Sequence, residues 1–396
     1  MSVHSEFQIE DERGDDKLIL YNAHILAHSV EVERGYIEIK GGKISRIVKG
    51  FPNIVAGTDL DCEGAYIFPG FIDTHIHGGN GVDTMDADEK AFKLLCDYEY
   101  SHGVTTFFPT TVTASFKKTL NVVNMLKVLN GKDGFENIGG IHLEGPFLDI
   151  KRIGAQNPSF LRSLDEDELR KWFSLGIVRV ITYAPVSDPR GSLPHLCREY
   201  GVKPSIGHSE ATFEEFERCY ALGVRHLTHF CNAMSGLHHR HVGLVGAGFL
   251  HNDVYLEVIA DRCHLNDQML RLIAKIKEPS RVILITDAIR ASGMKDGEYE
   301  LGGLKVSVLK GEARLKDGTL AGSTLTMEEG VKNYQIVTKL PLRTCLDAAT
   351  YNPAEFYGIK NAGDIREGME ADLVVCDTQT FNVLKTIKEG KVVFDG

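Results

Sequence analysis

Two histidines stand two positions apart in the stretch GFIDTHIHGG, where an apolar run ends. Side chains at positions i and i+2 of a β-strand point to the same face, so His75 and His77 could reach one point while Thr74 and Ile76 face away. Imidazole is a common metal ligand, and this geometry would let the pair bind one ion. The spacing fits two ordinary strand residues as well, so the rest of the chain has to decide.

Similar side chains end other apolar runs of the chain: Glu144, His208, His229, His264 and Asp287. Imidazole and carboxylate groups bind divalent transition metals such as Zn, Fe, Mn, Ni or Co. A metal of this kind leaves one position for water, lowers the pKa of that water to about 7 and so supplies hydroxide. These residue types predict a metal-dependent hydrolase, provided that the fold brings them together.

The elements that would position these residues follow a regular alternation between residues 67 and 363. Short apolar or β-branched runs, each followed by a longer amphipathic stretch, lie at 71–77, 105–111, 138–145, 178–185, 203–209, 226–233, 255–261 and 282–288. Eight strands alternating with helices are typical of an α/β protein with a (β/α)8 TIM-like barrel. An open doubly wound sheet would need a glycine-rich phosphate turn after the first strand, and GGNG lacks the rest of that pattern.

The two ends of the chain read as short strands broken by turns. Neither end has enough strands to bury a face of its own, so we expect residues 1–66 and 364–396 to form one small β-sandwich domain together. Within the barrel region, residues 296–322 alternate apolar and polar residues around Gly turns. This pattern predicts a β-hairpin insertion after the eighth strand, near the barrel mouth.

In a TIM barrel, the C-terminal ends of all eight strands meet at one face, where the active site is built. The seven histidine and acidic residues named above all stand at these predicted strand ends, which favours one shared site over seven separate structural roles. His142, two residues before Glu144, should face the barrel interior too. It could orient a ligand or contact substrate. His226, three residues before His229, should face away from the interior.

The motifs GFIDTHIHG, GIHLEGPF, IGHS, THFCNAM, ITDA and LAGSTLTM, followed by NPAEFYG and GMEADLVV, resemble the amidohydrolase superfamily. The similarity runs from about residue 35 to the end of the chain, and HLEGPF, NAM and LAGSTLTM are most similar to its amino-sugar-phosphate deacetylases. The resemblance implies hydrolysis of the acetamide of N-acetyl-D-glucosamine 6-phosphate to D-glucosamine 6-phosphate and acetate. The step would belong to amino-sugar catabolism or cell-wall recycling.

The resemblance also implies roles for single residues. Glu144, His208 and His229 match the ligands of the catalytic metal, and Asp287 matches the acid/base. The positions that match substrate contacts are Ala155, Asn232, Ala233, Arg240, Asp261, His264, Leu320, Ala321 and Gly322. Arg240 and His264 are the expected phosphate partners. Because members of the family complete the phosphate site across a dimer, we expect a homodimer.

The number of metals depends on His75 and His77, because family members that keep this pair bind two metals and members that lack it use one. We therefore expect one or two metals per chain. Other two-metal amidohydrolases use a carbamylated lysine on strand four, but VRVITYAP contains no lysine, which leaves Glu144 as the only evident bridge. Two departures stand out: Gln156, where many members carry His, and His241, where an acidic residue is usual.

The composition limits the partners. With 44 basic and 55 acidic residues the net charge is -11, and no basic run offers a field for nucleic acid. No segment approaches the ~20 continuous apolar residues of a membrane span, and residues 1–16 are polar and acidic, unlike a signal peptide. We expect a cytoplasmic protein.

Two alternative functions stay open at this point. One is deacetylation of another N-acetyl amino-sugar phosphate, such as the galactosamine epimer. The other is a catalytically silent barrel kept for binding or assembly, which predicts that ligands or the acid/base are missing. Neither the ligands nor Asp287 are missing from the sequence.

Overall fold

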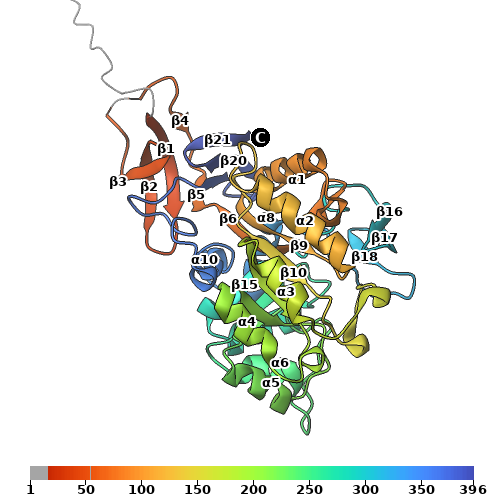
Figure 1. The fold of residues 1–396 in the computed structure, drawn as a ribbon. Helices are drawn as coiled ribbons and strands as arrows, with labels where there is room; N and C mark the ends of the chain where they lie inside the picture. The colour runs from red at the N-terminus through yellow and green to blue at the C-terminus, as the bar shows by residue number, and fades with distance from the viewer. Residues whose placement is uncertain (1–16, 54) are drawn as a thin grey trace, which may run out of the picture.

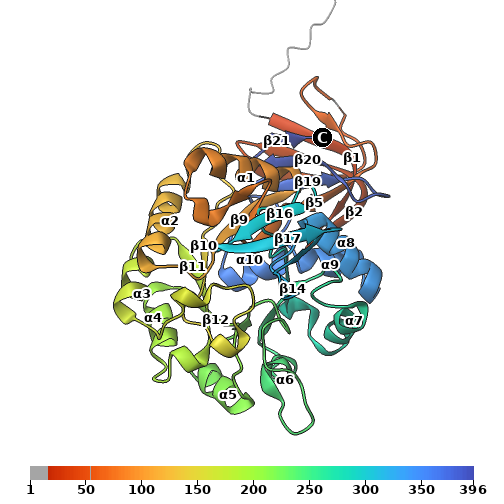
Figure 2. The same cartoon turned by 90° about the vertical axis from the view of Figure 1, so that its right-hand side faces the viewer.

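The computed structural model describes residues 17–53 and 55–396 (Figures 1 and 2), so the expectation for residues 1–16 lies outside the described part. Eight parallel strands form the central sheet in the order β15-β14-β13-β12-β11-β10-β9-β6. They are β6 (Phe71–Ile76), β9 (Val104–Thr111), β10 (Ile141–Glu144), β11 (Val178–Tyr183), β12 (Lys203–Ile206), β13 (His226–Leu227), β14 (Tyr255–Ile259) and β15 (Val282–Ile285). Spatial order follows chain order, which confirms the predicted TIM-like barrel.

The first and last barrel strands, β6 and β15, meet at a seam. At its upper end, where the barrel strands have their C-terminal ends, the Asp287 N–H donates to the His75 carbonyl at 2.8 Å. Lower down, the carbonyls of Ala348 and Ala349 accept one N–H from each strand at 2.8 and 2.9 Å. The upper bond holds the end of strand eight directly beside the histidine pair of strand one.

Helices surround the barrel (Figure 2). Their bounds are α1 (Glu89–Ser101), α2 (Phe116–Leu129), α3 (Glu166–Phe173), α4 (Ser192–Tyr200), α5 (Phe213–Ala221), α6 (Gly243–Leu250), α7 (Asp267–Ile276), α8 (Met327–Thr338), α9 (Leu342–Asp347) and α10 (Tyr351–Tyr357). Several begin at the residues that favour helix starts. Asp88 caps α1, Ser115 caps α2, and Thr212 forms a capping box with Glu215 at α5.

Helix α10 closes the lower end of the barrel. Phe356 and Tyr357 from this helix pack with Phe108, Val180 and Ile283, which belong to three different barrel strands. The interior below the site is therefore filled by side chains and is not an open channel, as is usual for this fold.

The two ends of the chain share one mixed sheet, in the order β21-β20-β19-β5-β1-β2-β3 with β4 beside β1 (Figure 1). Its strands are β1 (Lys17–Leu26), β2 (Glu31–Lys40), β3 (Lys43–Lys49), β4 (Leu60–Asp61), β5 (Tyr66–Pro69), β19 (Leu373–Cys376), β20 (Val383–Lys388) and β21 (Lys391–Asp395). Strands β5 and β19 join the N-terminal and C-terminal pieces in an antiparallel pair. The expected small domain made from both ends of the chain is present as a single sheet.

A separate antiparallel sheet lies over the barrel strands in Figure 2. It consists of β16 (Gly297–Leu301), β17 (Leu304–Leu309) and β18 (Glu312–Arg314). A two-stranded ribbon of β7 (Gly78–Gly79) and β8 (Val82–Asp83) follows the first barrel strand.

A buried ion pair in the small domain offers a test of its packing. Lys388 Nζ donates to Asp372 Oδ2 at 2.7 Å, and both side chains are buried. Lys388→Met would leave the Asp372 carboxylate buried without its cation, so we expect the free energy of unfolding in urea to fall by about 3–5 kcal/mol. The variant Lys388→Met/Asp372→Asn should recover part of this loss because it buries no charge. A loss below about 1 kcal/mol for Lys388→Met would contradict this assignment.

Candidate metal centre and active site

A cavity of about 540 Å³ opens at the C-terminal ends of the barrel strands. Its wall contains most of the residues expected from the sequence: His77, Glu144, Ala155, His208, His229, Asn232, Ala233, His264, Asp287, Leu320 and Gly322. Residues that are far apart in the chain therefore meet in one place, as a site at this face of a TIM barrel requires.

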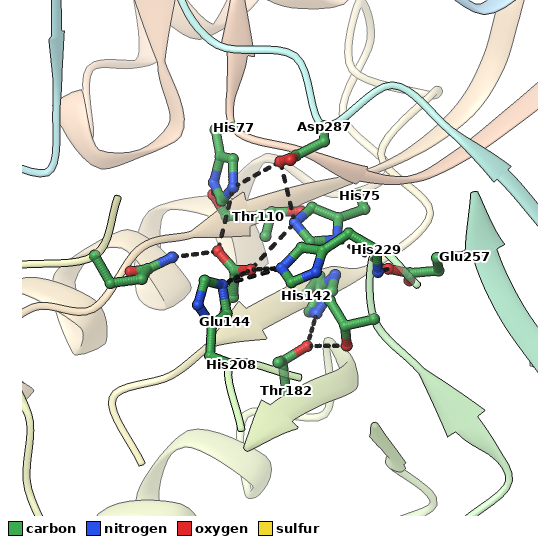
Figure 3. A network of polar contacts seen from close by, with 12 residues as sticks. His75, His77, Thr110, His142, Glu144, Thr182, His208, His229, Glu257 and Asp287 are labelled. Atoms are coloured by element: carbon green, nitrogen blue, oxygen red, sulfur yellow. Dashed lines mark hydrogen bonds and ion pairs between the residues drawn. The ribbon is translucent and has the colours of Figure 1, made fainter. Parts of the chain in front are cut away.

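Three of these residues form a compact group of ligand atoms (Figure 3). The Nε2 atoms of His208 and His229 each lie 3.0 Å from Glu144 Oε1, and the two Nε2 atoms lie 3.0 Å from each other. His208 Nδ1 is held by the Arg152 carbonyl at 3.0 Å, so its Nε2 is turned toward Glu144. All three side chains are buried.

The backbone turns sharply where these side chains enter the site. His208, His229 and Asp287 have φ values of 45°, 31° and 51°, in the left-handed region that non-glycine residues seldom occupy. Each follows a strand that has ended two residues earlier, so the turn redirects the side chain toward the barrel axis. Such conformations cost about 1–3 kcal/mol each and concentrate at functional sites.

A second group consists of His75, His77 and Asp287. Asp287 Oδ1 lies 3.2 Å from His77 Nε2 and 3.5 Å from His75 Nε2. Glu144 stands between the two groups, because its Oε1 is 3.7 Å from His75 Nε2 and its Oε2 is 3.3 Å from His77 Nε2.

The donor atoms suit a transition metal. Ring nitrogens 2.0–2.1 Å from a tetrahedral zinc ion stand about 3.4 Å apart, close to the separations within the Glu144, His208 and His229 group. Two imidazole nitrogens that face one carboxylate oxygen, as here, are a chelating arrangement. The residues present therefore fit a divalent metal.

Burial and the neighbouring charges shift the pKa values of the clustered side chains in different directions. Burial lowers the pKa of His75 well below its usual value, so the ring is neutral, as a metal ligand must be. Burial opposes ionisation of Glu144, but the charge and hydrogen bonds of the surrounding histidines hold its pKa well below the usual range. Burial opposes protonation of His77 and His208, but the neighbouring carboxylates raise the pKa of His77 well above its usual value and also raise that of His208. Protons on these rings balance the charge of Glu144 when no metal is bound, and a metal would have to displace them.

His142 is buried near the centre of the site, and other protein groups contact both of its ring nitrogens. His142 Nδ1 lies 3.2 Å from the Thr74 carbonyl and its Nε2 lies 2.7 Å from Thr182 Oγ1. Since both ring nitrogens are occupied and the ring does not line the cavity, the orienting role for His142 is favoured over a substrate contact.

The prediction that His226 faces away from the barrel interior is wrong. Its ring stacks on Phe356, a residue of α10 that packs inside the barrel, with 4.8 Å between the ring centroids. Its Nε2 lies 3.6 Å from Glu257 Oε1. Strand β13 ends at Leu227, and the left-handed turn at His229 breaks the two-residue alternation on which the prediction rested. Both histidines therefore face inward.

Four other expected site residues lie outside the cavity wall. His75 is fully buried beneath the wall, and Ala321 is fully buried between Leu320 and Gly322. Asp261 Oδ2 lies 2.7 Å from His264 Nδ1, so Asp261 orients the ring of His264. Arg240 is exposed.

Sequence reasoning missed several residues of the site. Lys151, Arg152 and Arg314 bring positive charge to the cavity wall. The first two lie four and five residues after the HLEGPF motif, and this proximity was the available signal. Gln156, noted only as a departure, donates to Glu144 Oε2 and accepts the Thr113 N–H at 2.7 Å.

Within residues 17–53 and 55–396, none of the helices combines the length and apolar character needed to cross a membrane.

Sequence relatives cover almost the whole chain. A profile of the amidohydrolase family matches residues 66–393. The N-acetylglucosamine-6-phosphate deacetylase of Lysinibacillus sphaericus is 35% identical over 380 residues, which are 95% of this chain and 97% of the relative. The N-acetylgalactosamine-6-phosphate deacetylase of Escherichia coli O157:H7 is 32% identical over 366 residues, 90% of this chain and 95% of the relative.

Solved structures agree with the sequence relatives. The crystal structure of the Thermotoga maritima N-acetylglucosamine-6-phosphate deacetylase superposes with a TM-score of 0.85 at 37% identity, covering 96% of this chain and 100% of that one. A mutant of the Mycobacterium smegmatis deacetylase, in complex with N-acetyl-D-glucosamine 6-phosphate, superposes with a TM-score of 0.89 at 32% identity, covering 96% and 99%. Together with the profile match, these similarities show that the chain belongs to the amidohydrolase family, among its N-acetylglucosamine-6-phosphate deacetylases.

Proposed function

We propose that this protein hydrolyses the acetamide of N-acetyl-D-glucosamine 6-phosphate, giving D-glucosamine 6-phosphate and acetate, in amino-sugar breakdown. The observation that carries the proposal is the meeting of Glu144, His208, His229 and Asp287 in one cavity whose wall also bears cationic side chains. Such a cavity can hold a metal-activated water at one end and an anionic group at the other.

Glu144, His208 and His229 would hold the catalytic metal, and His75 and His77 with Asp287 could hold a second. When bound, a divalent metal polarises the acetamide carbonyl and makes water acidic enough to serve as the nucleophile near neutral pH. Gln156 would keep Glu144 in place through its contact with Oε2.

Asp287 is the proposed general base and then acid. Its carboxylate lines the cavity and would take a proton from the attacking water and return it to the departing amine. The turn at Gly322 packs against it: a Cβ there would meet the Asp287 carbonyl oxygen at 2.8 Å, and φ at Gly322 is 63°. Only glycine allows this approach, which lets the Ser323 N–H donate to the same carbonyl at 2.8 Å.

The phosphate is proposed to lie against the cationic part of the wall. Arg152 and His264 line the cavity, and guanidinium groups suit phosphate because they donate two parallel hydrogen bonds.

Arg240 is exposed and stands outside the cavity wall of its own chain. We propose that it reaches the phosphate of a neighbouring subunit in a homodimer, and a monomeric mass by light scattering would contradict this part.

N-acetyl-D-galactosamine 6-phosphate is the second candidate substrate, because a relative at 32% identity is named for it. The two substrates differ in the orientation of one hydroxyl group. Measuring kcat/KM on both 6-phosphates would decide between them. A silent barrel is disfavoured, since every expected ligand and Asp287 are present in the described site.

The deciding experiment measures acetate release from N-acetyl-D-glucosamine 6-phosphate together with the metal content of the same preparation. We expect turnover that is lost on chelation and restored by divalent metal. A preparation that retains full turnover after complete metal removal, or that binds metal and shows no turnover, would refute the proposal.

The number of metals can be tested by removing the strand-one pair. We expect the His75→Ala/His77→Ala variant to lower the metal content from two equivalents per chain to one, because Glu144, His208 and His229 remain to hold the other. Elemental analysis after dialysis measures this. An unchanged content would show that His75 and His77 hold no metal.

A further inference from the structure

Glu257 is an acidic residue in the middle of the apolar strand β14, and its side chain is fully buried. Its neighbours on the same face, Tyr255 and Ile259, belong to the cluster inside the barrel, so Glu257 also faces inward. A carboxylate in such a place is costly unless it is paired or hydrogen-bonded. The proposed reaction gives it no direct role.

One oxygen of Glu257 makes two contacts with the ligand cluster (Figure 3). Oε2 accepts the backbone N–H of His229 at 3.1 Å and lies 3.0 Å from His75 Nδ1. Because this oxygen accepts the His229 N–H, the shared hydrogen is assigned to His75 Nδ1, an assignment that leaves the lone pair on Nε2.

His75 Nε2 is poised for a ligand. It is buried and has no hydrogen-bond partner among the described residues. It points toward Asp287 Oδ1 at 3.5 Å and Glu144 Oε1 at 3.7 Å, which are beyond good hydrogen-bond distance but suit atoms that share a cation. Glu257 therefore sets the ring orientation that the metal needs, through its contact with Nδ1, the other ring nitrogen of His75.

The donor atoms of His75, His142 and Glu257 also lie within 4.8 Å of one another, so a metal among these three has to be considered. His142 has both ring nitrogens occupied by Thr74 and Thr182, and Glu257 Oε2 already has two contacts. The group is therefore better explained as a support for His75 than as a separate metal site.

A chain of buried polar contacts continues beneath the site. Thr182 Oγ1 lies 2.7 Å from Thr228 Oγ1, Thr228 lies 2.5 Å from Ser205 Oγ, and Ser205 lies 2.9 Å from His226 Nδ1. His226 Nε2 then faces the second oxygen of Glu257. These contacts form a polar layer across the barrel interior that ends 3.6 Å from Glu257 Oε1, an oxygen without a hydrogen-bond partner among the described residues.

We propose that Glu257 is a positioning residue that fixes the tautomer and ring orientation of His75 for metal binding. This inference rests on the proposed metal site. It makes no use of the substrate, so a failed deacetylase assay would refute the proposed function and leave this inference standing.

The experiment measures the metal dissociation constant by competition with a chromophoric chelator, with no substrate present. Glu257→Leu fills similar space without an acceptor, and we expect it to weaken by about 10–100-fold the affinity for the metal equivalent that His75→Ala removes. Glu257→Gln should stay within about threefold of the wild type, because its amide oxygen still accepts both N–H groups. Matched controls are Glu99→Leu and Glu99→Gln, at a buried glutamate of α1 whose side chain makes no hydrogen bond or ion pair with a proposed metal-binding residue in the described part of the chain.

A double-mutant cycle tests whether the effect passes through His75. If Glu257 acts by orienting His75, the variant His75→Ala/Glu257→Leu should bind metal no more weakly than His75→Ala alone. Thermal unfolding of the metal-free variants reports whether each is folded. If Glu257→Leu is not, Glu257→Asp takes its place, because its shortened side chain retains the charge but cannot reach His75 Nδ1.

Several outcomes would overturn the inference. These are wild-type affinity in Glu257→Leu or in His75→Ala, an equal loss in Glu257→Gln and Glu257→Leu, an equal loss in the Glu99 controls, and additive losses in the cycle. The expected pattern is a large loss for Leu, recovery by Gln, and no further loss once His75 is absent.

Discussion

Asp287→Asn is expected to lower kcat by about 10²–10⁴-fold while the metal content stays at the wild-type level. Asparagine keeps the shape of the side chain and an oxygen near His77 Nε2, which the carboxylate approaches at 3.2 Å in the wild type. It cannot take a proton from water or deliver one to the leaving amine. The loss should therefore appear in both kcat and kcat/KM, because the missing interaction belongs to the transition state.

The control for this experiment is Asp317→Asn. Asp317 lines the same cavity from the segment after β18 and is exposed. We expect its kcat to stay within about threefold of the wild type, as for most surface substitutions. Wild-type kcat in Asp287→Asn would refute the proton-transfer role. Loss of metal from that variant would instead identify Asp287 chiefly as a ligand.

Glu144→Gln should have the largest effect on metal binding. Glu144 contacts His77, His208 and His229 and carries the charge that balances a cation. Loss of a residue that only orients a ligand weakens metal affinity by about 10–100-fold, so loss of this carboxylate should weaken it by about 100-fold or more. Turnover should fall below detection at metal concentrations that saturate the wild type.

Thermal unfolding provides an independent measurement of the same loss. A metal at about 100 times its dissociation constant stabilises the folded protein by about 2.7 kcal/mol, so added metal should raise the Tm of the wild type. Glu144→Gln should show no such rise at the same concentration, and chelator-treated wild type is the matched reference. A metal-dependent rise equal to that of the wild type would show that Glu144 is not a ligand.

The fold was largely predictable because its signals are local. Eight apolar runs separated by amphipathic stretches specify alternating strands and helices, and this alternation permits few architectures. The pairing of the two chain ends was also predictable, since neither end can bury a sheet face alone. The seam between β6 and β15 was not predictable, because the carbonyls of Ala348 and Ala349 that bridge it come from a remote segment.

In the site, too, features that depend on local periodicity were predictable, and features that depend on turns or on remote segments were not. Glu144, His75 and His77 lie on or directly after regular strands, where two-residue alternation holds, and their inward direction followed from the sequence. His226 was misplaced because β13 ends after two residues and a left-handed turn follows. Glu257 left a signal, an acidic residue in the apolar run YLEVIAD, but its partner His75 lies 182 positions away in the chain.

The sequence by itself determined the barrel, the family resemblance and the ligand types, because these depend on residue chemistry and short-range periodicity. Only the tertiary structure decided which nitrogen of each histidine faces the centre, how Glu144 stands between two ligand groups, and which cationic side chains line the cavity. Those features depend on left-handed turns and on contacts between remote segments, which the order of residues along a strand does not encode.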